Sequence, residues 1–402
     1  MNVKKTILMS LAVMMAGNIM LITGDGASIA SAQANKVPIG VSSVSTTKLD
    51  VSQQQQRIQQ ALEQFVAKGI PGVILQTVKD GVKQDYVAGK ASIYAERRMQ
   101  PDFHFRIGSI TKTFTATVIL QLVGEGKLSL DDSVEKWLPG VVQGKGYESS
   151  KITIRMLLNM RSGIPDFANG KIVDQILENR FKNYTAEELV KVGVEGGPLF
   201  APGSKFDYSS TNTVLAGLII QKVTGQTYAE QIKKRIIEPL KLNNTSVAGS
   251  ITKLPEPHAR GYAIKTIGGS LEDFTEINIS WGNAAGDMIS TTADINRFFS
   301  KLLAGNILKP EQMKEMFTAE LVDGGVGYGL GISERKTASG VSIWGHSGGT
   351  PGYISFAGGT LGGKHVITYN YTLHPGPDLD KANAAADMQK KVLEAEFGQS
   401  AQ

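Results

Sequence analysis

Ser109 and Lys112 are the residues of this chain whose types and spacing most clearly suggest chemistry. They lie within the stretch 105–114, FRIGSITKTF. Residues three apart lie on one face of a helix, so the hydroxyl and the amine can touch. A serine hydroxyl is a weak nucleophile until a base takes its proton, and a lysine can be that base when burial or charge lowers its pKa. The pair therefore predicts the nucleophile of an acyl-transfer enzyme.

The Ser-x-x-Lys spacing occurs five times, so context must separate the candidates. Only Ser109 precedes a long uncharged run with apolar residues at helical period, and Gly108 allows a tight entry into that helix. The other pairs lie in polar surroundings or short loops, where a solvated serine and a surface lysine are expected: Ser45–Lys48, Ser133–Lys136, Ser250–Lys253 and Ser333–Lys336.

The first 34 residues are expected to be a signal peptide. Lys4 and Lys5 form a charged start, residues 6–24 carry no charge, and Ala32-Gln33-Ala34 fits a small-residue cleavage site. The alternative is an uncleaved membrane anchor, because the apolar stretch is nearly long enough to span a bilayer. We expect cleavage after Ala34 and a secreted protein, extracellular or associated with the cell wall. Residues 35–51 are polar and are expected to form a flexible leader.

Composition excludes several other classes. The chain has 402 residues, no cysteine and a formal net charge of +5. It can have neither disulfides nor a lipid-modified cysteine, and its lysines are scattered, so we expect no nucleic-acid partner. Its five histidines form no metal-binding pair and no phosphate loop is present, so neither a metal nor an organic cofactor is expected. No long heptad is found, and we expect a monomer.

The element pattern predicts one α/β (α+β) domain over residues 52–402. Strands 73–78 and 82–88 are joined by the hairpin signal Asp80-Gly81. Strands return at 329–333, 341–344, 353–357 and 366–371, and helices are expected at 52–68 and 379–396. We therefore expect an antiparallel sheet, formed by parts 52–112 and 286–398, with a helix from each end of the chain beside it. Residues 113–285 are expected to form a large helical insertion, with helices at 153–159, 186–192, 212–224 and 228–237.

Two further segments could complete the chemistry. Tyr208 follows the rigid turn APGS at 201–204 and precedes a predicted helix, although a loop tyrosine can also be a packing residue. The segment 343–353, IWGHSGGTPGY, follows a strand, and its small residues would let a substrate backbone approach closely. The alternative for this segment is a glycine-rich hairpin without chemistry.

Taken in order, the three motifs resemble those of the serine penicillin-recognising enzymes. They are Ser109-x-x-Lys112, Tyr208-Ser209-Ser210 and His346-Ser347-Gly348. The most similar group is the class C type, with secreted D-alanyl-D-alanine carboxypeptidases, class C β-lactamases, D-aminopeptidases, alkaline D-peptidases and related esterases. The resemblance runs from about residue 57 to 396 and includes LQLVGEGKL at 120–128, ITIR at 152–155, RSG at 161–163, APG at 201–203 and GYGLG at 327–331.

The resemblance implies a β-lactamase/transpeptidase-like fold and a role for each motif residue. Ser109 would attack the carbonyl, and Lys112 and Tyr208 would share the general base and acid work. The backbone N–H groups of Ser109 and Gly349 would form the oxyanion hole. His346 and Ser347 would line the cleft and bind the carboxylate end of the substrate. The other implied substrate-binding residues are Gly348 and Trp281, and Trp281 would be an aromatic wall unless it is a core residue.

Two positions depart from the family pattern. Peptidases and class C β-lactamases have Tyr-x-Asn in the middle motif, but this chain has Ser210 at the third position. Serine is shorter than asparagine and offers only one hydroxyl, which favours the interpretation of the protein as an esterase. In β-lactamases the last motif is usually Lys-Thr-Gly, and His346 in place of lysine favours a peptidase.

We therefore expect a secreted D-alanyl-D-alanine carboxypeptidase or D-stereospecific peptidase, with D-residue peptides or peptidoglycan stem peptides as substrates and β-lactams as inhibitors. The alternatives are a family esterase, a class C-like β-lactamase, and a non-catalytic protein that binds penicillin or peptidoglycan. A competing nucleophile elbow, GHSGG at 345–349, fits Gly-x-Ser-x-Gly. That motif requires a helix after the serine, whereas the sequence predicts a turn and a strand.

Overall fold

The computed structural model describes residues 46–398, except 169–170 and 323–324. The predicted signal peptide and the leader up to residue 45 lie outside the described residues. Helix α2 (Thr46–Ala67) begins six residues before the predicted helix start at residue 52, within the segment expected to be the leader. Within the described residues, no helix combines the length and apolar character needed to cross a membrane.

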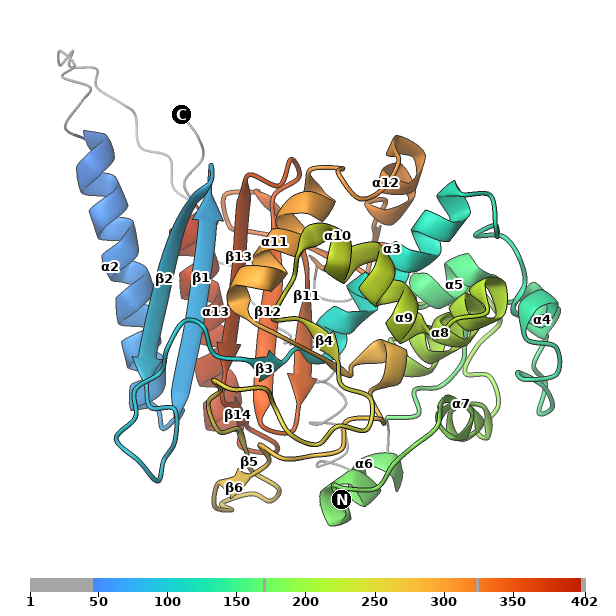
Figure 1. Cartoon of the computed structure of the whole chain (residues 1–402), viewed down its shortest axis with the longest axis horizontal. Helices are drawn as coiled ribbons and strands as arrows, with labels where there is room; N and C mark the ends of the chain where they lie inside the picture. The colour runs from blue at the N-terminus through green and yellow to red at the C-terminus, as the bar shows by residue number, and fades with distance from the viewer. Residues whose placement is uncertain (1–45, 169–170, 323–324, 399–402) are drawn as a thin grey trace, which may run out of the picture.

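An antiparallel sheet of eight strands forms the centre of the molecule, as predicted. Its order is β2-β1-β13-β12-β11-β10-β9-β8, so the N-terminal hairpin lies beside the last long strand (Figure 1). The alternating strand signals and the Asp80-Gly81 turn account for this hairpin. The strands are β1 (Gly72–Lys79), β2 (Val82–Gly89), β8 (Glu320–Leu321), β9 (Gly327–Tyr328), β10 (Ser333–Lys336), β11 (Ser342–Thr350), β12 (Tyr353–Gly359) and β13 (His365–Tyr371).

One face of the sheet is covered by helices from the two ends of the chain. Helix α2 packs against α13 (Leu379–Phe397), and both bury apolar side chains on the sheet. The ring of Phe65 meets the ring of Tyr371 edge to face, with centroids 5.0 Å apart. This layer closes the domain by joining residues that are more than 300 positions apart in the sequence.

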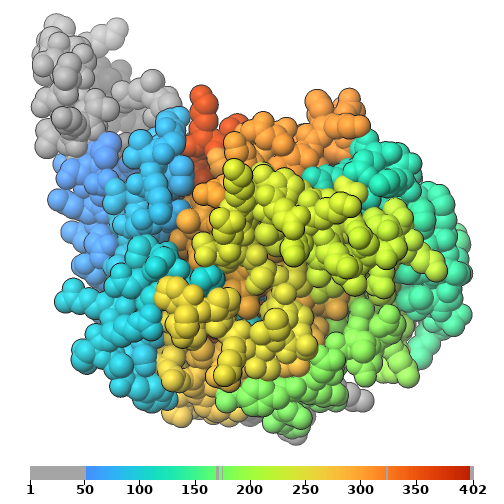
Figure 2. Space-filling model, viewed as in Figure 1, coloured from blue at the N-terminus to red at the C-terminus, as the bar shows by residue number. Residues whose placement is uncertain are grey.

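The other face of the sheet carries the helical part of the molecule. Helix α11 packs on β13, β12 and β1, and a short 3₁₀ turn at Gly108–Ile110 packs on β11 and β12. Figure 2 shows residues of the helical part, coloured green to yellow, covering this face beside the blue N-terminal strands. The helices are α3 (Thr111–Gly124), α4 (Val134–Trp137), α5 (Ile154–Leu158), α6 (Lys171–Glu178), α7 (Ala186–Val194), α8 (Ser210–Thr224), α9 (Tyr228–Ile232), α10 (Glu238–Leu240), α11 (Thr292–Leu303) and α12 (Pro310–Met316).

The part predicted as a helical insertion also contains short strands. In one three-stranded sheet, β7 (Met288–Ser290) lies between β3 (Phe105–Arg106) and β4 (Ser246–Val247). In the other, β5 (Tyr262–Ala263) lies between β6 (Glu272–Asp273) and β14 (Leu373–His374). Two-residue strands carry too few positions for a periodic signal, so the sequence could not reveal them. The β3–β7 pairing matters for function because it holds the chain immediately before Ser109.

The strand predicted at 329–333 is wrong over most of its length. Residues 329–332 form a turn between β9 and β10, closed by a hydrogen bond from Gly329 N to Ile332 O of 2.9 Å. Gly331 has φ +70°, and a Cβ there would lie 2.5 Å from the Ala116 side chain. Gly331 adopts a positive φ and has no side chain, so the backbone can turn in close contact with α3 instead of continuing as an extended strand.

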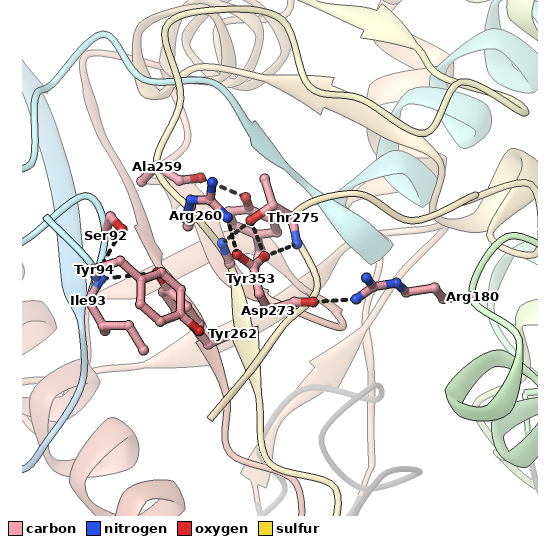
Figure 3. A network of polar contacts seen from close by, with 11 residues as sticks. Ser92, Ile93, Tyr94, Arg180, Ala259, Arg260, Tyr262, Asp273, Thr275 and Tyr353 are labelled. Atoms are coloured by element: carbon pink, nitrogen blue, oxygen red, sulfur yellow. Dashed lines mark hydrogen bonds and ion pairs between the residues drawn. The ribbon is translucent and has the colours of Figure 1, made fainter. Parts of the chain in front are cut away.

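A polar network fixes the start of β12, next to the strand that carries the third motif (Figure 3). The Tyr353 hydroxyl donates to Ala259 O at 2.8 Å, and Arg260 pairs with Asp273 at 2.5 Å. The Thr275 hydroxyl also donates to Asp273, at 2.6 Å. The turn between β11 and β12 is thereby tied to the segment 259–275.

Candidate active site

Ser109 and Lys112 meet at the entrance to a helix that is buried over most of its length. Gly108, with φ +53°, begins the 3₁₀ turn that carries Ser109, and α3 starts two residues later. Lys112 Nζ lies 3.0 Å from Ser109 Oγ and 3.0 Å from Ala285 O. The two side chains are only 7% and 1% exposed, because α3 is apolar on nearly every face and lies inside the helical part.

Burial gives Lys112 the protonation behaviour of a base. It lowers the pKa of the Lys112 ammonium from 10.5 to about 7, and the negative charge of Asp166 opposes part of this change. Removing the ammonium from water disfavours its charged form, which is why the pKa falls. At neutral pH a large fraction of Lys112 is therefore uncharged and able to accept the Ser109 proton.

Tyr208 lies on the loop before α8, and its ring is next to Lys112. The Lys112 Nζ is 5.0 Å from the centre of this ring. Burial raises the pKa of the Tyr208 hydroxyl well above its usual value; Tyr328 and Asp166 raise it further, and the Ser109 side chain opposes the rise. Tyr208 is thus protonated at neutral pH. It can pass on a proton, while the base work in the resting state falls to Lys112.

His346 lies on β11 and faces the same centre. Its ring is 6.2 Å from the Tyr208 ring, its Nε2 is 3.2 Å from the Tyr328 hydroxyl, and its Nδ1 is 2.6 Å from Ser347 O. Because the carbonyl can only accept, Nδ1 carries the proton and Nε2 accepts from Tyr328. Burial, helped by the charges of Lys112 and Arg335, lowers the pKa of His346 to about 3. His346 is therefore neutral with both nitrogens engaged, and it lacks the charge expected for binding a substrate carboxylate.

The Ser347 side chain lies on the opposite face of the sheet, which corrects the expectation that it lines the substrate site. Ser347 pairs with Phe356, which belongs to the core beneath α2 and α13. Directly paired residues point to the same face. The Ser347 hydroxyl accordingly meets Arg335 Nη2 at 3.4 Å and lines a small cavity beside α13 together with Tyr369 and Gln389.

Gly348 and Gly349 bring the backbone of β11 against the nucleophile. A Cβ on Gly348 would lie 1.9 Å from Ile107 O and 3.0 Å from Ser109 N, and one on Gly108 would lie 2.6 Å from Gly349 N. Only glycines permit this approach. The backbone of Gly349 thus lies close to that of Gly108, and the oxyanion hole that the resemblance implies for the Ser109 and Gly349 N–H groups stays a prediction.

The remaining predicted residues, Ser210 and Trp281, have different surroundings. Ser210 begins α8, is 8% exposed, and donates its backbone N–H to Asp166 Oδ1 at 3.1 Å. Trp281 is 5% exposed within the core of the helical part, and its Nε1 is buried without a partner among the described residues. It precedes the turn that supplies Ala285 O, and its role as an aromatic wall stays a prediction.

Sequence reasoning did not single out three groups that lie in this centre: Asp166, Tyr328 and the carbonyl of Ala285. The motif RSG at 161–163 was part of the resemblance, and Asp166 stands only three residues beyond it. A lone carboxylate after a proline in an otherwise uncharged stretch is a signal that could have found it. Tyr328 lies within GYGLG at 327–331, another stretch of the resemblance, whereas a backbone carbonyl such as that of Ala285 carries no local signal.

Three of the rival serines have structural explanations, while Ser45 lies outside the described residues. Ser133 caps the N-terminus of α4 by accepting from Lys136 N at 3.2 Å. Ser333 donates to Gly345 O at 2.8 Å. Ser347 lies in the middle of β11 and the next element is β12, so the helix that a nucleophile elbow needs is absent at this position. In the part of the chain that the structure describes, no group of three or more acidic or histidine side chains could hold a metal ion.

Several known proteins are similar to this chain. Residues 58–390 match the family model Beta-lactamase. Penicillin-binding protein 4* of Bacillus subtilis strain 168 is 27% identical over 341 residues, covering 82% of this chain and 72% of that protein. Protein flp of Staphylococcus aureus strain N315 is 32% identical over 251 residues, or 61% of this chain, and the match spans only 48% of flp.

Two solved structures are similar over nearly their whole length. A D-stereospecific amidohydrolase from Streptomyces sp. superposes with a TM-score of 0.78 at 40% identity, covering 86% of this chain and 99% of that one. A D-amino acid amidase from Ochrobactrum anthropi SV3 has a TM-score of 0.75 at 31% identity, with 85% and 98% covered. With the fold described above, the family match over residues 58–390 shows that this chain belongs to the β-lactamase family, as a serine hydrolase related to the penicillin-binding proteins.

Proposed function

We propose that the protein is a D-stereospecific peptidase or amidase that acts through an acyl-enzyme on Ser109. The observation that carries this proposal is the buried Lys112 Nζ, 3.0 Å from Ser109 Oγ, with its pKa lowered to about 7. A base poised near neutral pH is what a serine nucleophile requires. The names of two similar structures, a D-stereospecific amidohydrolase and a D-amino acid amidase, support a D-residue on the acyl side.

In this proposal the proton moves in a short relay. Neutral Lys112 accepts the Ser109 proton as Oγ bonds to the substrate carbonyl, and the backbone N–H groups of Ser109 and Gly349 stabilise the oxyanion. The C–N bond then breaks, and the leaving amine takes a proton through the Tyr208 hydroxyl, which is replenished by the Lys112 ammonium. Water reverses the sequence on the ester carbonyl and releases the D-residue acid.

The peptidase or amidase form is better supported than the D-alanyl-D-alanine carboxypeptidase form. A carboxypeptidase must bind a terminal carboxylate beside the scissile bond, which calls for a cation or free donors. His346 is neutral and both its ring nitrogens are engaged, while the Ser347 hydroxyl lies on the other face of the sheet. These two residues therefore offer no charge to a terminal carboxylate.

Ser210 supports a second candidate, an esterase. A peptide substrate presents an amide that an asparagine at this position could bind with both a donor and an acceptor, whereas serine has one hydroxyl. An ester has no N–H group, so an ester substrate does not need both a donor and an acceptor at position 210. A purely binding protein is less well supported, because it would have no use for a base hydrogen-bonded to its nucleophile.

The test compares four substrates with the purified protein: the p-nitroanilides of D- and L-phenylalanine, a tripeptide ending in D-Ala-D-Ala, and a short-chain p-nitrophenyl ester. We expect hydrolysis of the D-anilide over the L-anilide, and loss of all activity in Ser109→Ala. A fluorescent penicillin should label Ser109, as located by mass spectrometry. Preference for the tripeptide would restore the carboxypeptidase form, ester hydrolysis alone would favour the esterase, and an active Ser109→Ala would refute the mechanism.

We also propose that the protein is secreted, on the strength of the charged start, the apolar stretch and the Ala32-Gln33-Ala34 site. Expression of the full chain in a bacterial host should release a protein whose N-terminal residue is Asn35. Retention of the full-length chain in the membrane fraction would indicate the uncleaved anchor instead.

A further inference from the structure

The carboxylate of Asp166 lies in the catalytic centre, and none of the steps above uses it. Its charge acts on both Lys112 and Tyr208. Its Oδ1 accepts the backbone N–H of Ser210 at 3.1 Å, two residues beyond Tyr208. Asp166 therefore stands close to the base and in contact with the middle motif.

The loop that carries Asp166 is clamped to the first turn of α8. Thr211 Oγ1 accepts Phe167 N at 3.0 Å and donates to Pro165 O at 2.7 Å, so both neighbours of Asp166 are held by one side chain. Four residues earlier in the same loop, Ser162 Oγ donates to Asn212 Oδ1 at 2.6 Å. These contacts hold the carboxylate in one position, as a specificity-determining group requires.

One carboxylate oxygen remains for a ligand. Oδ1 takes both hydrogen bonds that Asp166 makes within the described residues, from Ala168 N at 3.0 Å and from Ser210 N. Asp166 is partly buried, and burial raises the pKa of its carboxyl, while the N–H groups of Ala168 and Ser210 and the charge of Lys112 oppose the rise. A cationic ligand would likewise favour the ionised form. Oδ2 is not among the buried side-chain oxygens that lack a partner in the described residues. A carboxylate oxygen accepts from a donor, most strongly from a cationic one. The adjacent Lys112 is the catalytic base and must be neutral when it acts, so it does not balance this charge during the reaction.

We propose that Asp166, assisted by the Ser210 hydroxyl, binds the free α-ammonium group of the substrate's N-terminal D-residue, an inference that rests on the proposed function. The α-ammonium is one carbon away from the carbonyl that Ser109 attacks, so it must lie beside the catalytic serine. Its three N–H donors match acceptors on a carboxylate and a hydroxyl. Ser210, being shorter than asparagine, leaves room for this group. The substrates are then D-amino acid amides and peptides with an unblocked D-residue at their N-terminus.

The test uses D-phenylalanine amide and N-acetyl-D-phenylalanine amide, which differ only in the charge and donors of the α-nitrogen. The wild-type protein should have the higher kcat/KM for the free amine. Asp166→Asn keeps an oxygen for the two backbone donors but removes the charge. It should lower kcat/KM for D-phenylalanine amide by about 10- to 100-fold more than for the acetylated substrate, as expected for a charge-assisted hydrogen bond. The acetylated substrate reports the part of the change that comes from the altered pKa of Lys112.

Asp207→Asn is the matched control, because Asp207 is an exposed carboxylate close enough to act on Asp166. It should retain the preference for the free amine. Equal loss on both substrates in Asp166→Asn, or no preference in the wild type, would overturn the assignment. Labelling of Ser109 by a fluorescent penicillin, measured on each variant, reports an intact centre. A wild-type protein that is labelled but cleaves neither D-amide would instead refute the proposed function.

Discussion

Replacing Lys112 by methionine is expected to inactivate the protein and, at neutral or lower pH, to stabilise its fold. Methionine has a similar length but no charge. The pKa of Lys112 falls from 10.5 to about 7 on folding, and its side chain is 1% exposed. At about 1.4 kcal/mol for each pKa unit, keeping this lysine protonated in the folded state costs about 5 kcal/mol. The nucleophile is thus activated at the expense of stability.

The sign of the effect depends on pH. Between about pH 7 and 10.5 the unfolded chain holds a proton on Lys112 that the folded chain does not, so the stability of the wild type rises with pH across this window. The methionine variant has no such slope. It leaves Ser109 Oγ and Ala285 O without their lysine donor, which costs about 1–3 kcal/mol at any pH. The variant should therefore be more stable than wild type by about 2–4 kcal/mol at pH 6 and less stable by about 1–3 kcal/mol above pH 10.5.

Urea unfolding followed by tryptophan fluorescence at pH 6, 8 and 10 measures this difference. Lys222→Met, at an exposed position of α8, is the control and should show a small difference that does not change with pH. Activity of Lys112→Met should fall by about 10²–10⁴-fold, and wild-type kcat/KM should rise with pH through an apparent pKa near 7. A stability difference that is the same at pH 6 and pH 10, or a kcat/KM profile flat below pH 8, would refute the reasoning.

Three more substitutions test other parts of the centre. Gly348→Ala would place a Cβ 1.9 Å from Ile107 O and push β11 away from Ser109. Steady-state assays should then show kcat reduced by about 10²–10³-fold, because the Gly349 N–H would no longer reach the oxyanion. A variant with the wild-type kcat would show that β11 does not supply an oxyanion donor. Ser347→Ala should keep kcat/KM within about threefold of wild type, since the hydroxyl faces α13, and a larger loss would return Ser347 to the substrate site. Asp287 is fully buried beside the Tyr228 hydroxyl, and burial raises its pKa from 3.8 to about 7. The folded state then holds a proton that the unfolded state has lost, and wild-type stability should fall as pH rises through this window, by up to about 4 kcal/mol. Asp287→Asn should remove that slope in unfolding measurements at pH 5 and 8, and an unchanged slope would assign it to another group.

Local spacing, together with the uncharged run that follows it, was enough to predict that Ser109 and Lys112 are in contact. Ser109 and Lys112 are one helical turn apart, and an uncharged run after them indicates a buried helix, so both their contact and the burial of the lysine follow from residues within one segment. The Asp80-Gly81 hairpin and the terminal helices could be predicted for the same reason. Helical and strand periodicity, and turn chemistry, depend on neighbours along the chain.

The identity of the substrate-facing groups was decided by the tertiary structure. Alternation along a strand shows that His346 and Ser347 face opposite sides, but only pairing with β12, formed by residues further along the chain, determines which side faces Ser109. The neutrality of His346 depends on its burial beside Tyr328, and the position of Asp166 depends on hydrogen bonds to α8, 44 residues away. Charge state and strand facing are set by contacts between distant segments, and these exist only in the folded chain.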